Sequence, residues 1–164
     1  MSLREIALTL PNRPGTLANV SRTLAKERIN VAAISVDSTG TRGRVRLIVS
    51  DPDRALRLLA QNGYKVEARE MIAVRLEDRA GSFLRVLEVL AKGKVNVQSV
   101  AILIAREGNQ PLVALSTKDA DLPKARKILS QAGFTSPLAD RLVSNPDLLA
   151  TAPSIPSETV GLLL

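Results

Sequence analysis

The sequence predicts an α+β protein in which two copies of one structural unit follow each other, each with an antiparallel sheet and two helices on one face. Three observations support this. A turn between a strand and a helix occurs twice, with Gly15 and Gly81 in equivalent positions 66 residues apart. Apolar residues alternate before each turn, as in a strand, and recur at helical spacing after it. The same order of elements then follows both turns, which indicates a duplicated unit.

The first copy is predicted to contain strand 5–10, helix 14–27, strand 31–38, strand 44–50, helix 52–61 and strand 64–70. The residues between the second and third strands, 38–43, carry the Gly-rich pattern of a hairpin. Clear sequence signals mark both ends of the second helix. Asp51 can cap its N-terminus, Pro52 suits its first position, and Gly63 suits the position just after its end.

The second copy is predicted to contain strand 72–77, helix 80–92, strand 95–105, strand 112–117, helix 122–131 and a short strand near Phe134. With right-handed crossovers, this βαββαβ order gives the ferredoxin-like arrangement, in which both helices lie on one face of four antiparallel strands. We therefore divide the chain into a first unit at residues 1–70, a second unit at 71–136 and a C-terminal tail at 137–164 that prolines interrupt.

The two units are expected to pack together. A unit of this size would bury only about 60% of its unfolded surface on its own. Segments 31–34 and 100–104 are apolar at successive positions, so both faces of these strands need cover. Leu84 and Leu87 add a second apolar stripe to helix 80–92 that the first copy lacks, which indicates an additional contact with the tail or with another chain.

Composition excludes several classes of function. The chain has no Cys and no His, so disulfides, Cys-ligated zinc, iron–sulfur clusters and a Ser–His–Asp triad are ruled out. No paired carboxylates, phosphate loop or activated nucleophile stand out, and we expect no enzyme activity, no metal and no cofactor. No apolar run approaches the length of a membrane span. The N-terminal residues lack the apolar segment of a secretory signal, so we expect a cytoplasmic protein.

The duplicated turn is the best candidate for a binding site. Where a strand turns into a helix, the first backbone N–H groups have no partner within the helix, and the helix dipole favours negative charge. A glycine at this point leaves the backbone open to a carboxylate. Asn30 and Asn96, before the second strand of each copy, offer both donors and acceptors. The same residues also suit a turn without a ligand, in which Asn12 and Asp78 simply cap the helices.

The residues around each turn resemble the opening of an ACT domain. In that family, a turn with Asp or Asn followed by Arg, Pro and Gly leads into a helix and then into a Gly-(Ile/Val)-Asn-(Ile/Val) segment. Residues 12–17 and 29–34 match this pattern in the first copy, and 78–83 and 95–97 match it in the second. The resemblance implies a regulatory module that binds amino acids or similar metabolites. It also implies side-by-side pairing, with ligands between the first helix of one module and the turn of its neighbour, and therefore a homodimer.

The resemblance carries ligand-binding roles onto particular residues. Asn12 and Asn30 match two amides that contact the ligand in serine-sensing members, but Leu10 stands where those members have histidine, so the ligand need not be serine. In the second copy, Asp78 would repel a carboxylate and could accept an ammonium group. The predicted ligand-binding residues are Asn12, Arg13, Pro14, Gly15, Thr16, Leu17, Asn30 and Val31 in the first copy, and Asp78, Arg79, Ala80, Gly81, Ser82, Phe83, Asn96 and Val97 in the second.

Other functions remain open at this point. The chain could be an oligomerisation or partner-docking module without a small ligand. Its net charge of +7 and the alternating Arg42, Arg44 and Arg46 would suit a nucleic acid. The first and third strands, however, lack the aromatic residues on which RNA-recognition domains of this strand order stack bases. A metal carrier of the same fold is excluded in its usual form, because the chain has no cysteine pair.

Overall fold

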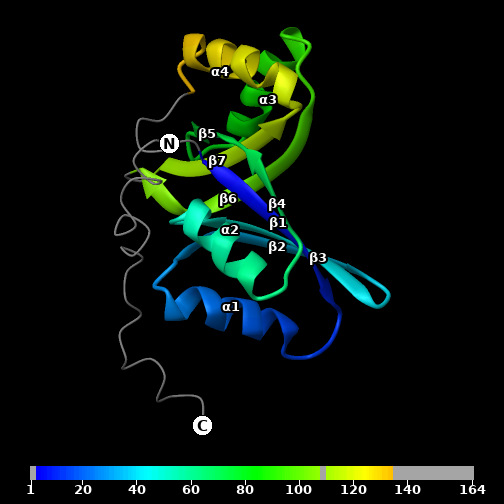
Figure 1. The fold of residues 1–164 in the computed structure, drawn as a ribbon. Coiled ribbons are helices and arrows are strands. Elements are labelled where there is room, and N and C mark those ends of the chain that lie inside the picture. The colour runs from blue at the N-terminus through cyan, green and yellow to red at the C-terminus, as the bar shows by residue number, and fades with distance from the viewer. Residues whose placement is uncertain (1–2, 108–109, 135–164) are drawn as a thin grey trace, which may run out of the picture.

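A computed structural model describes residues 3–107 and 110–134 of the chain. Two βαββαβ-type units follow each other in it (Figure 1). Unit 1 consists of β1 (Arg4–Pro11), α1 (Thr16–Lys26), β2 (Val31–Thr39), β3 (Arg42–Val49), α2 (Pro52–Gln61) and β4 (Val66–Glu70). Unit 2 consists of β5 (Ile72–Arg75), α3 (Ser82–Lys92), β6 (Val97–Glu107), β7 (Gln110–Thr117), the short 3-10 helix η1 (Asp119–Asp121) and α4 (Leu122–Gln131).

The predicted fold class is confirmed. Unit 1 has a four-stranded antiparallel sheet in the order β2-β3-β1-β4, and the described part of unit 2 has a three-stranded antiparallel sheet in the order β5-β7-β6. The short strand predicted near Phe134 is not formed within the residues described, although the Arg75 N–H donates to the Phe134 carbonyl at 3.1 Å. The tail predicted at 137–164 lies outside the described residues.

The helix boundaries follow the local signals in the sequence. Helix α2 occupies the predicted range, because Asp51 Oδ1 accepts a hydrogen bond from the Arg54 N–H at 3.0 Å and Gly63 takes a left-handed conformation just after its end. Helices α1 and α3 begin two residues later than predicted. Their N-cap positions are Gly15 and Gly81, whose positive φ angles cannot belong to a right-handed helix.

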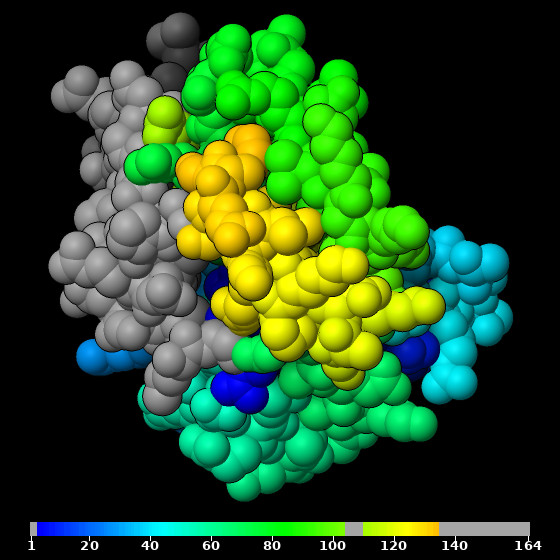
Figure 2. All heavy atoms as spheres, turned by 90° about the horizontal axis from the view of Figure 1, so that it is seen from above, coloured from blue at the N-terminus to red at the C-terminus, as the bar shows by residue number. Residues whose placement is uncertain are grey.

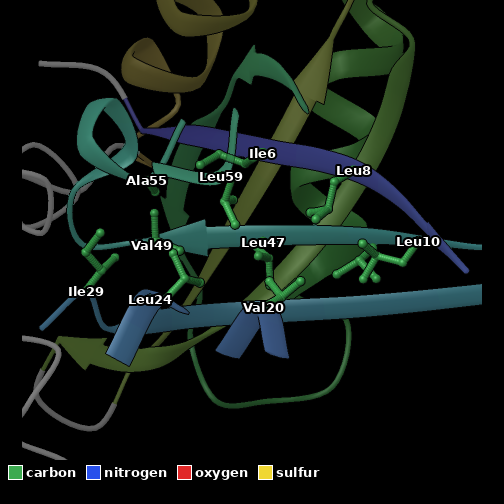
Figure 3. Close-up of a cluster of buried hydrophobic side chains, with 11 residues drawn as sticks. Ile6, Leu8, Leu10, Val20, Leu24, Ile29, Leu47, Val49, Ala55 and Leu59 are labelled. Atoms are coloured by element: carbon green, nitrogen blue, oxygen red, sulfur yellow. The ribbon is translucent and has the colours of Figure 1, made fainter. Parts of the chain in front are cut away.

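Each unit has its own aliphatic core between its sheet and its helices. In unit 1, the inward side chains of β1 and β3 meet one face of α1 and α2, as Figure 3 shows for Ile6, Leu47 and Val20 among others. Unit 2 repeats this arrangement with Val74, Leu115 and Leu90. Helices α3 and α4 lie on the outer side of the second sheet in Figure 1, and their side chains form much of the coloured surface seen from above in Figure 2. Leu84 on α3 remains 57% exposed, so the extra helix contact expected from the sequence is absent from the described part of the chain.

A third core joins the two units. It lies on the sheet faces opposite the helices, so the two sheets lie between two pairs of helices (Figure 1). Its buried members are Leu3, Ala32, Ala33, Ile48, Met71, Ala73, Leu103, Leu112 and Ala114. The prediction that both faces of the second strands need cover is confirmed for Ala33 and Leu103, but Ile34 and Ile102 remain exposed at the sheet edges.

An ion pair links the start of unit 1 to α2. The guanidinium of Arg4 lies 2.7 Å from the carboxylate of Asp53, and its hydrogen bond lowers the pKa of Asp53 below the usual value. Because the folded-state pKa is the lower one, the contribution to stability is present above the unfolded-state pKa and is lost as the pH falls through the folded-state pKa. Asp53→Asn should therefore lower the melting temperature at neutral pH, and the difference from the parent protein should shrink on acidification.

Thermal melts of both proteins across the acid range measure this effect. Asp119→Asn is a suitable control, because Asp119 is exposed and forms no ion pair among the described residues. A difference between the parent and Asp53→Asn that stays constant with pH would contradict the assignment.

Candidate functional site

Two equivalent turns, one in each unit, hold residues 12–17 and 78–83 of the predicted ligand-binding set. Gly15 and Gly81 have φ angles of 85° and 82°, in the left-handed region that favours glycine. Each glycine is the N-cap residue of the helix that follows, and in neither case does a side chain cap the helix. A Cβ atom built at either position would meet no atom within 4 Å. The backbone at both turns is therefore open to a small molecule.

In unit 1, the first turn of α1 presents unpaired backbone donors. The Thr16 N–H donates to the Arg13 carbonyl at 3.3 Å. The N–H groups of Leu17 and Ala18 have no hydrogen-bond partner among the described residues. Such groups, at the positive end of the helix dipole, suit a carboxylate or another small anion.

Unit 2 repeats this geometry. The Ser82 N–H donates to the Arg79 carbonyl at 3.3 Å, and the N–H groups of Phe83 and Leu84 find no partner among the residues described. The buried Ser82 hydroxyl accepts a hydrogen bond from the Glu77 N–H at 3.0 Å, so it holds the end of the strand instead of capping the helix.

Asn12 has a specific structural role that differs from helix capping. Its side-chain amide donates to the Gly40 carbonyl at 3.0 Å, and its backbone N–H donates to the Thr41 carbonyl at 2.8 Å. Both bonds fasten the turn to the β2–β3 hairpin. The side-chain oxygen of Asn12 accepts no hydrogen bond from the residues described. The amide therefore keeps an acceptor beside the turn.

The two turns differ in charge and in whether their arginines form ion pairs. Asp78 in unit 2 stands where unit 1 has Asn12. The guanidinium of Arg79 is bound by the Glu77 carboxylate, which also lies 3.6 Å from Arg85. Arg13, by contrast, is exposed and forms no ion pair within the described part of the chain. The unit 1 turn is therefore better suited to a carboxylate.

Asn30 and Asn96 lie just before the second strands, away from the turns of their own units. The backbone of Asn30 is fixed by Ser50, since the Asn30 N–H donates to Ser50 Oγ at 3.0 Å and the Ser50 N–H donates to the Asn30 carbonyl at 2.9 Å. The Asn30 side chain is exposed. The 11 residues of α1 separate it from the turn, which corresponds to about 16 Å along the helix. A single unit therefore does not bring Asn30 close to the residues of its own turn.

The remaining predicted residues differ in exposure. Val31, Val97, Thr16 and Phe83 are half-buried, and Leu17 lies at the surface. Exposed residues at the turns and strand starts are Arg13, Pro14, Gly15, Asp78, Arg79, Ala80, Gly81 and Asn96. Phe83 can thus border a ligand while it also packs against the core of unit 2.

A groove beside the unit 1 turn was not predicted. It has a volume of about 280 Å³, lies between α1 and β2, and is lined by Leu17, Ala18, Ser21 and Ile34 together with core residues. Leu84 and Leu87 stand where unit 1 has Ala18 and Ser21. The sequence contained a signal for this groove. The small residues Ala18 and Ser21 of α1 take the positions at which α3 has an apolar stripe of leucines.

The described residues contain no cluster of three or more Asp, Glu, His or Cys side chains that could hold a metal ion. Within this same part of the protein, every helix is too short or too polar to cross a membrane.

Comparisons with known proteins agree with the fold. The family model for an ACT domain pair matches residues 1–145. A search of curated proteins returned no match. Among solved structures, protein BT0572 from Bacteroides thetaiotaomicron has 26% sequence identity and a TM-score of 0.77, over 88% of this chain and 98% of that one. The ligand-free regulatory subunit of aspartate kinase from Thermus thermophilus has 20% identity and a TM-score of 0.57, over 80% and 92%.

The contacts of Asn12 lead to a prediction about stability. Asn12→Ala removes a hydrogen bond between the turn and the hairpin and should lower the free energy of unfolding by about 0.5–1.5 kcal/mol. Asn96→Ala is the matched control, because the exposed side chain of Asn96 makes no hydrogen bond with described residues, and it should change stability little. Chemical denaturation measures both values. Equal effects of the two substitutions would argue against a structural role for Asn12.

Proposed function

The chain belongs to the ACT domain pair family, and from this premise we propose that it is a non-catalytic regulatory protein that binds an amino acid or a related small metabolite at its strand–helix turns. The observation that carries the proposal is the repeated turn. In both units a left-handed glycine opens the first turn of a helix, and no side chain caps that helix. The open backbone donors of these two turns are the groups that a carboxylate would bind.

The groups around the unit 1 turn suit the carboxylate of an α-amino acid. The N–H groups of Leu17 and Ala18 supply two donors, and the uncommitted guanidinium of Arg13 supplies a third. Hydrogen bonds to charged groups contribute about 1.5–3 kcal/mol each. Two or three of them, less the cost of ordering the ligand, correspond to a dissociation constant of about 10 μM to 1 mM. A metabolite sensor works in that range.

The ammonium group needs an acceptor, and Asn30 from a neighbouring unit is the proposed one. Strand β2 is an edge strand that runs from Val31 to Thr39 and ends at the hairpin that Asn12 binds. If β2 pairs with β2 of a second chain in antiparallel fashion, the start of each strand lies beside the end of the other. Asn30 of one copy then comes close to the Asn12 turn of its partner. We therefore propose a homodimer in which paired units complete the ligand sites.

The two units are proposed to have different preferences. The unit 2 turn carries Asp78, and its Arg79 is already bound by Glu77, so a free carboxylate gains less there. We propose that the unit 1 turn binds the amino acid carboxylate and that the unit 2 turn favours a ligand with a cationic group. The downstream partner would be another protein, in keeping with a regulatory family.

A specific observation also favours a second candidate function, an oligomerisation or docking module without a small ligand. The edge strands of both sheets expose apolar side chains on the side of the helices, with Ile34 and Val36 on β2 and Val100 and Ile102 on β6. Exposed edges with apolar residues are templates for pairing with another chain. Under this alternative, the surfaces serve a partner alone and amino acids have no effect.

Ligand binding at the turn can be tested with a thermal-shift screen against the twenty amino acids. A ligand that binds only the folded protein raises the melting temperature at concentrations well above its dissociation constant. Gly15→Leu should abolish this response for the ligand of unit 1, because the side chain occupies the space in front of the free N–H groups. Gly81→Leu should leave that response unchanged.

Gly63→Leu is the matched control for backbone strain. Gly63 has a φ angle of 82°, and its Cβ would also meet no atom within 4 Å, but it follows α2 and borders no free donors. Each of these substitutions should cost about 1–2 kcal/mol of stability through the left-handed conformation. A protein that responds to none of the amino acids, or a Gly15→Leu variant that responds fully, would refute the sensor and leave the docking module.

The homodimer can be tested by light scattering coupled to gel filtration. Ile34→Glu should convert the dimer to a monomer and weaken the response to the amino acid, because a charge on the edge strand opposes pairing. Ala60→Glu places the same charge at an exposed position on α2 and should leave the mass unchanged. If the parent protein is a monomer with full ligand affinity, the paired arrangement is wrong.

A further inference from the structure

A second cavity lies between the two sheets, away from both turns. It has a volume of about 330 Å³ and is lined by residues of β1, β2, β3 and β6. Strands β2 and β6, the outer strands of their sheets, lie next to each other here. The exposed side chains of Ile34, Val100 and Ile102 mark its opening to solvent. This volume is at the lower end of the range for small-molecule sites and suits a ligand of amino acid size.

Glu5 lines this cavity from the central strand β1. Its neighbours in the sequence show its direction, because Ile6 packs in the core with the helices while Leu3 belongs to the core between the sheets. Glu5 lies on the Leu3 side, since successive residues of a strand point to opposite faces. Glu5 is only 6% exposed. A carboxylate is thus placed in a largely apolar space between two sheets.

The carboxylate of Glu5 has no partner among the described residues. No hydrogen bond or ion pair within this part of the chain reaches it, although Arg69 stands directly opposite on β4. The other charged residue at the cavity, Arg46, is already held by Asp37 at 2.5 Å and by Ser35 at 3.1 Å. A carboxylate that faces a largely apolar cavity without a partner favours the binding of a cation or of hydrogen-bond donors there.

We propose that this cavity binds a small aliphatic ammonium compound, with the ammonium group on Glu5 and the aliphatic part against Ala33, Ile48 and Ala101. An ammonium group supplies the positive charge and the three donors that the carboxylate lacks. The walls supply apolar contact for a short branched chain. The site is distinct from the turns, which present N–H donors for an anion and lie at the ends of the helices.

Three probes of matched shape test the charge requirement. 3-Methylbutylamine carries the ammonium group and a branched chain, 3-methylbutan-1-ol is its neutral counterpart, and leucine adds a carboxylate. Titrations are followed by NMR of methyl-labelled protein, with Ile48, Val100 and Ile102 as reporters. Ile34 is less suitable because it also borders the groove beside α1. The amine should shift the reporter signals at millimolar concentration, and the alcohol should not.

The titration with leucine shows whether the ligand can carry a carboxylate in addition to its ammonium group. If leucine shifts the reporters as strongly as the amine does, the natural ligand class includes amino acids. If only the amine shifts them, the ligand lacks a carboxylate. Gly15→Leu separates this site from the unit 1 turn, because it should leave the cavity signals unchanged in either case.

Two substitutions should weaken binding, and one should not. Glu5→Gln keeps the shape but removes the charge, and should weaken binding of the amine at least about tenfold. Ala101→Leu fills the cavity and should abolish the response while Glu5 stays in place. Glu67→Gln removes an exposed carboxylate on β4 and serves as the control. The proposal is overturned if Glu5→Gln binds the amine like the parent protein, if the alcohol binds equally well, or if no reporter moves.

The stability of Glu5→Gln without ligand gives an independent readout. If Glu5 is an unpaired buried charge, its replacement removes a desolvation cost and the melting temperature should rise. If Arg69 neutralises it in solution, the replacement leaves a cation without its partner and the melting temperature should fall. A fall would overturn the proposal, because the carboxylate would then have a structural role.

Discussion

The contact between the two sheet faces is the constraint on which the rest of the structure depends. Met71 is the single residue between β4 and β5, and its N–H donates to the Leu3 carbonyl at 2.8 Å while its side chain is buried in the core between the sheets. So short a connection keeps the two sheets adjacent. Alanines on both sides, such as Ala33 and Ala114, leave room for the close approach of the sheets. Each unit thereby covers the second face of the other.

This packing determines which surfaces remain available. The helices cover the outer faces and the sheets cover the inner ones, so the open backbone groups are left at the edge strands and at the turns. Because α1 separates the unit 1 turn from Asn30, a single unit does not bring these two groups of residues together. In the proposed dimer, a second chain along the edge strands would bring them together, as in the pairing expected from the family.

Local signals in the sequence made the helices and strands predictable. Contacts between segments that lie far apart in the sequence could not be predicted in this way. Helix α2 matched its predicted range because Asp51, Pro52 and Gly63 act within one turn of its ends. The role of Asn12 was missed, since its partner Gly40 lies 28 residues away. Glu5 occupies a polar position in an alternating strand, which ordinarily predicts exposure to water. Its burial depends on a sheet formed by residues from the other half of the chain.

The two copies share the backbone of the turn but differ in the side chains around it. Both copies have the left-handed glycine and the uncapped helix. These are backbone features, so the neighbouring side chains can change without altering them. The charges of the side chains differ in the way that the two proposed ligand preferences would require. Unit 1 keeps a neutral amide, a free arginine and small residues beside its groove, whereas unit 2 has an acid, a bound arginine and leucines at those positions. Glycine adopts this left-handed conformation without the steric cost that other residues would pay, so both copies keep the same backbone at the turn. The shared backbone beside a different set of charges is what the proposed difference in ligand preference between the two turns requires.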